Sequence, residues 1–228
     1  MKLRLRSRNK PRGTSAYFDI KRAFPDLRVE TVIDIGANEG QSTETFLDDF
    51  PHAHMFCIEP SCANFEKLSK KFSGSKRISC FNLALSNETG TALLDTTGRG
   101  DMHRLVTETA EDNEKTVVQE VEVSTLDDFC MQHDLRHIHY LKVDTEGHEL
   151  AVFSGANKML TASNTSLVEV ELGMNPENTY HTRFEDGKAV LEENGFRLFA
   201  IYEQVDEWPT KQPHLRRVNA IFASQKLL

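Results

Sequence analysis

Short apolar runs alternate with amphipathic segments along most of this chain. The runs at 31–35, 55–58 and 139–143 are rich in β-branched and aromatic residues, which is typical of buried strands. Further strands are expected at 78–85, 91–94, 117–123, 166–172, 196–202 and 218–223. Apolar residues at spacings of three and four predict helices within 14–28, 41–50, 61–72, 126–133, 149–160 and 184–194.

Local signals mark some of the element ends. Ser42 or Thr43 is available to cap the second helix. Gly195 is well placed to end the last one. The valines at 117–123 alternate as they would in an edge strand, and the polar segment 96–114 predicts a long mobile loop.

Strands and helices alternate from residue 31 to about residue 172. This order predicts an α/β fold with a Rossmann-like, doubly wound, mainly parallel sheet, which the last two strands close as a C-terminal antiparallel hairpin. Ligands of such sheets bind beyond the carboxyl ends of the strands. Candidate chemistry is therefore expected at Asp34 to Gly40, Glu59, Ala84 to Ser86, Asp144 to Glu146 and Glu169 to Gly173.

Charge divides the chain into two parts. The first twelve residues hold six basic residues and no acidic one, which gives them a charge of +6. Because the net charge of the chain is −8, the remaining residues carry −14. We predict a basic, flexible arm at 1–13 and a single domain at 14–228. The arm could be merely solvated, could contact phosphates or an anionic membrane surface, or could be a mitochondrial presequence. The acidic body argues against nucleic acid as a partner.

Composition predicts a cytoplasmic protein. No apolar run approaches the ~18 residues of a membrane span, and the N-terminus lacks the apolar segment of a secretory signal. The four cysteines form no C-x-x-C pair, which favours reduced thiols over metal ligands or disulfides.

The segment between the first strand and its helix has the pattern of a cofactor loop. Gly36 and Gly40 allow tight turns and close approach of a ligand, and the following helix N-terminus attracts a carboxylate or phosphate. A dinucleotide loop needs a glycine where Asn38 stands, so a compact zwitterion fits better than a pyrophosphate, with Asp34 and Asn38 beside its ammonium group. Glu59 ends the next strand and can accept both hydroxyls of a ribose. Singly, Asp34 and Glu59 could merely cap helices or pair with basic residues; together they indicate a nucleoside.

Three blocks of the chain resemble the FkbM family of methyltransferases. They lie at 32–40, 124–129 and 141–149, and the last continues into Ala151-Val152-Phe153-Ser154-Gly155-Ala156. The resemblance implies a class I methyltransferase fold and S-adenosyl-L-methionine as cofactor. It also implies methyl transfer to an oxygen, usually a hydroxyl of a sugar, a glycan or another small metabolite.

The resemblance also assigns residues to the cofactor. It implies that Asp34, Gly36, Asn38, Gly40 and Glu59 line the cofactor site. By position after the third strand, Ala84 and Leu85 are expected near the adenine.

Catalytic candidates gather at the end of the strand at 139–143. Lys142, Asp144 and Glu146 follow a period of two, which directs them to the same pocket. Asp144 is the first choice for orienting the acceptor or accepting its proton. His148 is the nearest group with a suitable ordinary pKa, although it could equally be a capping residue. His103 in the polar loop is a weaker candidate base.

A metal ion is not predicted. Asp144, Glu169 and Glu171 could hold Mg²⁺, but pairing of one glutamate with Lys142 is the simpler interpretation.

Three other functions stay open. An RNA ribose 2′-O-methyltransferase would use the basic arm, yet 167–175 lacks the lysine that such enzymes commonly carry. A non-catalytic S-adenosylmethionine-binding module and, more weakly, a dehydrogenase are the others. The acceptor itself cannot be deduced, because fold does not choose among hydroxyls.

Overall fold

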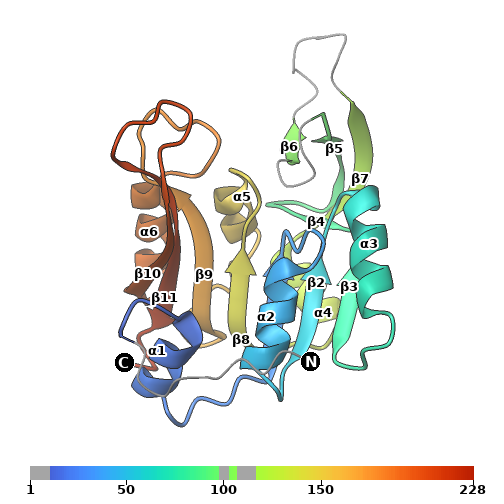
Figure 1. The fold of residues 1–228 in the computed structure, drawn as a ribbon. Coiled ribbons are helices and arrows are strands. Elements are labelled where there is room, and N and C mark those ends of the chain that lie inside the picture. The colour runs from blue at the N-terminus through green and yellow to red at the C-terminus, as the bar shows by residue number, and fades with distance from the viewer. Residues whose placement is uncertain (1–10, 98–102, 107–116) are drawn as a thin grey trace.

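The computed structural model describes residues 11–97, 103–106 and 117–228. Among these residues a seven-stranded sheet forms the centre, in the order β10-β11-β9-β8-β1-β2-β3 (Figure 1). Its strands are β1 (Thr31–Ile35), β2 (His54–Ile58), β3 (Ile78–Phe81), β8 (Ile138–Val143), β9 (Thr165–Gly173), β10 (Phe196–Asp206) and β11 (Leu215–Ser224).

The strand directions confirm the doubly wound prediction. β1 pairs in parallel with β2 on one side and with β8 on the other, and β3 and β9 extend the parallel part. The hairpin of β10 and β11 joins β9 in antiparallel direction. The order therefore reverses between β1 and β8, which puts a ligand site above these two strands.

Helices cover both faces of the sheet. Phe129 of α4, Phe153 of α5 and Leu191 of α6 share one apolar core. Ile20 of α1, Phe46 of α2 and the apolar face of α3 share the other. The helices are α1 (Ala16–Ala23), α2 (Gln41–Asp49), α3 (Cys62–Phe72), α4 (Leu126–Gln132), α5 (Glu149–Ser154) and α6 (Phe184–Glu193).

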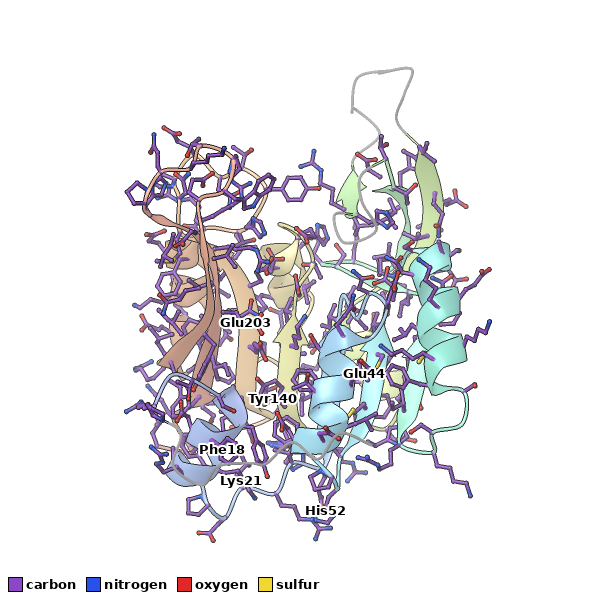
Figure 2. All side chains as sticks on the ribbon, viewed as in Figure 1. Phe18, Lys21, Glu44, His52, Tyr140 and Glu203 are labelled. Atoms are coloured by element: carbon purple, nitrogen blue, oxygen red, sulfur yellow. The ribbon has the colours of Figure 1, made fainter. Side chains whose placement is uncertain are left out.

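Tyr140 of β8 shows how the second face is built. Its ring lies against Phe46 and Phe50, at the level of α1 and α2 (Figure 2). Side chains two residues apart on a strand share a face, so Lys142 follows Tyr140 on this α2-covered side.

A second sheet corrects two predicted strands. The expected strand 78–85 is two strands, because the Asn82 side chain turns back and donates to the carbonyl oxygens of Glu59 and Pro60, at 2.9 and 2.8 Å. The segment 117–123 is not an edge strand, since β7 pairs with β4 on one side and β5 on the other. This sheet has the order β4-β7-β5-β6, with β4 (Ala84–Leu85), β5 (Gly90–Asp95), β6 (Arg104–Val106) and β7 (Val118–Ser124).

Two helix predictions also change. The helix expected at 149–160 ends at Ser154, because Gly155 follows and its backbone packs against the carbonyl of Ser86. Neither Ser42 nor Thr43 caps α2; its N-cap is Gly40, with a φ of 82°. Gly195 follows the end of α6 with a φ of 84°, as predicted.

Parts of the chain fall outside the described residues. Residues 1–10 of the predicted arm at 1–13, with its predicted contacts to anionic surfaces, are one of them. Most of the predicted loop 96–114 is another, and within that loop Arg104–Val106 forms β6. The single domain at 14–228 stays a prediction. No described helix combines the length and apolarity needed to cross a membrane.

Candidate cofactor and acceptor site

A cavity of about 250 Å³ opens at the carboxyl ends of β1, β2, β8 and β9, beside the second sheet. Of the predicted site residues, it is lined by Gly36, Asn38, Glu59, Ala84, Leu85, Lys142, Asp144, Glu146 and His148. It therefore brings the predicted cofactor loop and the predicted catalytic strand end to one space.

Gly36 sets how closely the cofactor loop approaches β8. It has a φ of 77°, and a Cβ atom here would lie 1.8 Å from the carbonyl oxygen of Asp144. Gly40, at a φ of 82°, likewise has no room for a side chain, since a Cβ would lie 2.4 Å from the Phe72 ring. Gly40 does not line the cavity; it lets the loop turn into α2.

Glu59 is fixed by two backbone amides. Its Oε2 accepts a hydrogen bond from the Asn38 amide at 2.8 Å, and its Oε1 accepts one from the Ser61 amide at 2.9 Å. Burial raises the pKa of Glu59 to about 7, against the two amide hydrogen bonds that lower it. The Asn64 side chain also hydrogen-bonds to this carboxylate, and of its roughly four acceptor positions at least one is left for a ligand.

Asp34 lies behind the cavity wall. Its side chain is fully buried, and its Oδ2 accepts a hydrogen bond from Thr43 Oγ1 at 2.9 Å. Its Oδ1 makes no hydrogen bond among the described residues, and Lys142 Nζ is 3.8 Å away. Burial raises the pKa of Asp34, while the charge of Lys142 opposes that rise.

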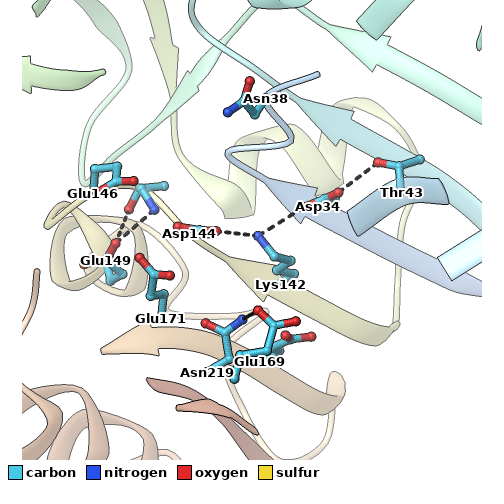
Figure 3. A network of polar contacts seen from close by, with 12 residues as sticks. Asp34, Asn38, Thr43, Lys142, Asp144, Glu146, Glu149, Glu169, Glu171 and Asn219 are labelled. Carbon is cyan, nitrogen blue, oxygen red and sulfur yellow. Dashed lines mark hydrogen bonds and ion pairs between the residues drawn. The ribbon is translucent and has the colours of Figure 1, made fainter. Parts of the chain in front are cut away.

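Lys142 joins the two predicted parts of the site. Its ammonium donates to Asp144 Oδ2 at 2.8 Å and faces Asp34 on its other side (Figure 3). Burial lowers the pKa of Lys142, but the charges of Asp144, Asp34 and Glu169 outweigh burial and raise it. Lys142 therefore stays charged and holds Asp144 in place, and it has no proton acceptor role at neutral pH.

Asp144 and Glu146 reach the cavity from the turn after β8. The side chain of Asp144 is 27% exposed, whereas Lys142 beside it is 5% exposed. Glu146 has a φ of 53°, and its Oε2 lies 3.6 Å from Nε2 of His181. Burial and the charges of Glu171 and Asp144 raise the pKa of Glu146 to about 8.

His148 and Glu149 have structural contacts. His148 is the N-cap residue of α5, and its Nε2 lies 2.8 Å from Ser86 Oγ, directly after Ala84 and Leu85. Burial lowers the pKa of His148. Glu149 Oε1 accepts from the backbone amides of Thr145 and Gly147 at 2.9 and 3.2 Å, so it fixes the turn that carries Glu146.

The second sheet closes the remaining side of the cavity. Leu83, Ala84, Leu85 and Leu94 give it an apolar wall on that side, and Asn64 of α3 adds a polar group. His103 and Arg104 also line it, so this part of the predicted polar loop reaches the site. The Arg104 guanidinium lies 5.3 Å from the centre of the Tyr180 ring, which belongs to the loop after β9.

Sequence reasoning missed site residues that lie far from its motifs. Arg217 of β11 lines the cavity and pairs with Glu171, and His181 lies 2.9 Å from Glu171. Their positions depend on antiparallel pairing and on a long loop, which no local motif marks. Glu169 accepts a hydrogen bond from the hydroxyl of Tyr140, and it does not line the cavity that Glu171 lines. Neither glutamate is among the ion-pair partners of Lys142, which are the two aspartates.

Comparison with known proteins identifies the family. A model of the Methyltransferase FkbM domain matches residues 34–198, well over half of the chain. The chain belongs to the FkbM methyltransferase family. Its cofactor is accordingly S-adenosylmethionine.

The FkbM protein has a curated relative with a stated reaction. It is 27% identical over 142 residues to the 2-O-methyltransferase NoeI of Sinorhizobium fredii. The aligned stretch covers 57% of this chain and 58% of the relative. The chain thus spans less than two thirds of the length of that relative.

Two solved structures are similar to this chain at low sequence identity. TrmK of M. capricolum, in complex with S-adenosyl-homocysteine, is 6% identical with a TM-score of 0.49, over 91% of this chain and 68% of that one. Fibrillarin of Methanococcus jannaschii is 10% identical with a TM-score of 0.49, over 87% and 67%.

The residues of the FkbM site fit this cofactor. A carboxylate at Glu59 with spare lone pairs suits a ribose, and the apolar wall at Leu83 to Leu85 suits an adenine. Gln41 and Ser42 line the cavity at the start of α2, where free amide groups suit the carboxylate of an amino-acid tail. Gly36 also lines the cavity, so its backbone can contact the cofactor.

Proposed function

We propose that this FkbM protein transfers the methyl group of S-adenosylmethionine to a hydroxyl oxygen of a sugar, a glycan or another small metabolite. The observation that carries the proposal is the single cavity that holds both Glu59, suited to the cofactor ribose, and Asp144, suited to an acceptor hydroxyl. The stated 2-O-methylation by NoeI supports oxygen as the acceptor atom.

The residues divide into holding and reacting groups. When bound, the cofactor supplies an electrophilic methyl group on a sulfonium. Glu59 holds the ribose hydroxyls, and the apolar wall at Ala84 and Leu85 contacts the adenine. Asp144, exposed to the cavity and fixed by Lys142, accepts the hydrogen bond of the acceptor hydroxyl and aims its oxygen.

The reaction balances without a further reactant. The acceptor oxygen forms a bond to the methyl carbon while the methyl–sulfur bond breaks, which leaves a neutral thioether. The hydroxyl proton passes to the carboxylate of Asp144. Since displacement at a sulfonium depends mostly on alignment, the rigid link between Gly36 and Asp144 supports this role.

The first experiment measures cofactor binding by calorimetry. S-adenosylmethionine and S-adenosylhomocysteine should bind the full chain in the micromolar range, and NAD should not bind. Glu59→Ala should weaken both, whereas the control Glu66→Ala, on the exposed side of α3, should leave them unchanged. No adenosyl binding in folded protein would remove the proposal.

The second experiment follows the methyl group. Protein and radiolabelled cofactor are incubated with a panel of mono- and oligosaccharides, small polyols and RNA. Label on a sugar or metabolite hydroxyl supports the proposal, and label on RNA ribose overturns the acceptor class. Binding without transfer to any acceptor would favour a non-catalytic module.

A further inference from the structure

Glu146, Glu171 and His181 converge from three separate segments beside the acceptor side of the cavity. One side-chain atom of each lies within 4.8 Å of the other two. His181 Nε2 is 2.9 Å from Glu171 Oε2 and 3.6 Å from Glu146 Oε2. Glu171 and His181 are both 7% exposed. Ligand atoms around a single ion at ~2.0–2.2 Å have similar mutual spacings.

A residue outside this cluster holds the histidine ring. The amide of Asn178 contacts His181 Nδ1, through Nδ2 at 2.9 Å and Oδ1 at 3.3 Å. Asn178 is itself buried and accepts from the backbone amide of Tyr180 at 3.0 Å. An imidazole held at one nitrogen, with the other aimed at carboxylates, is how proteins orient a metal-binding histidine.

The carboxylates around this cluster outnumber the basic side chains that contact it. Glu146 feels the charges of Glu171, Asp144 and Glu149. Glu149 is 1% exposed, and its Oε2 makes no hydrogen bond in the described part of the chain. Arg217 pairs with Glu171, and Lys142 is engaged by two aspartates. Buried carboxylates in this number need either protons or a further positive charge, and a bound cation supplies the latter.

We propose that Glu146, Glu171 and His181 bind one divalent first-row transition-metal cation, with its free coordination positions facing the acceptor cavity. Two carboxylates and an imidazole suit Mn²⁺, Fe²⁺ or Zn²⁺ better than Mg²⁺. Glu146 and Glu171 line the cavity and His181 stands behind them, so the open side of the ion faces the acceptor.

This site deepens the proposed function and rests on it for its role. An ion with three protein ligands has room for two adjacent hydroxyl oxygens, so it selects a vicinal diol, as in many sugars. The ion would also ease loss of the proton from a coordinated hydroxyl. Asp144, in the same turn as the ligand Glu146, would lie close enough to accept that proton. The acceptor class that follows is a polyol with neighbouring hydroxyls.

Metal binding is tested on the protein alone, without acceptor or turnover. The full chain is freed of metal with chelator and titrated with Mn²⁺, while electron paramagnetic resonance counts the free ion. One Mn²⁺ should bind per chain. Glu146→Gln and His181→Asn should each weaken binding by about tenfold or more. The matched control His52→Ala, at the end of the molecule remote from the cavity, should bind as the unmodified chain does (Figure 2).

Each outcome decides the proposal separately from the proposed function. Binding that follows these variants supports the site even if no methyl transfer is found. Absent binding, or binding indifferent to both variants in protein with an unchanged circular dichroism spectrum, overturns it. His181 then acts only as an ion-pair partner of the two glutamates, and adenosyl binding still tests the cofactor site independently.

Discussion

The carbonyl oxygen of Asp144 occupies the space that any side chain on Gly36 would need. An ideal Cβ at Gly36 would lie 1.8 Å from that oxygen. The amide of Asp144 also donates to the carbonyl of Ile35 at 3.1 Å. The cofactor loop and the proposed acceptor turn are thus held together by backbone atoms, which no side-chain rearrangement can relieve.

Gly36→Ala should therefore disrupt both folding and cofactor binding. The φ of 77° and the clash with backbone together should cost about 3 kcal/mol or more of the free energy of unfolding. Urea denaturation measures that cost, and calorimetry with S-adenosylhomocysteine measures the binding loss. Gly74→Ala is the control, because nothing lies within 4 Å of a Cβ there. Equal stability of the two variants would contradict this account of the loop.

Lys142→Met should leave two aspartates without their cation. Lys142 is 5% exposed between Asp34 and Asp144, and removing one partner of a buried pair costs about 3–5 kcal/mol. Lys188→Met, at a half-exposed pair on α6, should change the free energy of unfolding by no more than ~0.5 kcal/mol. Chemical denaturation of both variants gives the comparison, and similar small losses would show that Lys142 is not needed to balance the aspartates.

Thr43→Val should destabilise the protein through Asp34. The substitution keeps the shape of the side chain but removes the hydroxyl that donates to the buried carboxylate at 2.9 Å. We expect a loss of about 1–3 kcal/mol in the free energy of unfolding. Thr45→Val, exposed on the same helix, should have little effect. Thermal or urea unfolding measures the stability of both variants. Equal stability of Thr43→Val and Thr45→Val would show that the Thr43 hydroxyl contributes nothing.

Cofactor affinity should depend on pH through Glu59. Burial raises the pKa of this acid to about 7, so it is protonated below that pH and charged above it. Ribose hydroxyls donate to the charged form, so affinity is full above pH ~7 and falls by up to about tenfold per pH unit below it.

Calorimetry with S-adenosylhomocysteine across this range measures the pH dependence. Glu59→Gln has no proton to lose, so its weaker binding should be flat with pH. An equally flat profile in the unmodified chain would show that the ribose does not use this carboxylate.

The periodic part of the fold was predictable because each element carries its own signal. The run at Thr31–Ile35 reads as a buried strand and is one, and the hairpin at the end of the chain was expected and is present. The misplaced boundaries arise from single side chains that act over a distance. Asn82 ends β3 by binding the end of β2, and Gly155 ends α5 at its contact with Ser86.

The site divides in the same way. Glu59 and Asn38 lie within a local motif, and the structure places them in direct hydrogen-bond contact. Asp34 was expected to face the cofactor but lies behind the cavity wall, since its strand position directs it toward Thr43 under α2. His181 and Arg217 carry no motif, because their places follow from the loop after β9 and from the pairing of β11 with β9.

The segments around the cavity are of two kinds, and the contact between Arg104 and Tyr180 belongs to the second. One kind consists of strand ends whose register is set by the sheet. The other is β6, whose Arg104 lines the cavity and contacts Tyr180 in the loop after β9. Segments at the edge of the second sheet and in loops can change in length and composition without shifting the strands of the central sheet. Replacing these segments could therefore change which substrate the protein prefers, while the strand ends that bind the methyl donor keep their positions.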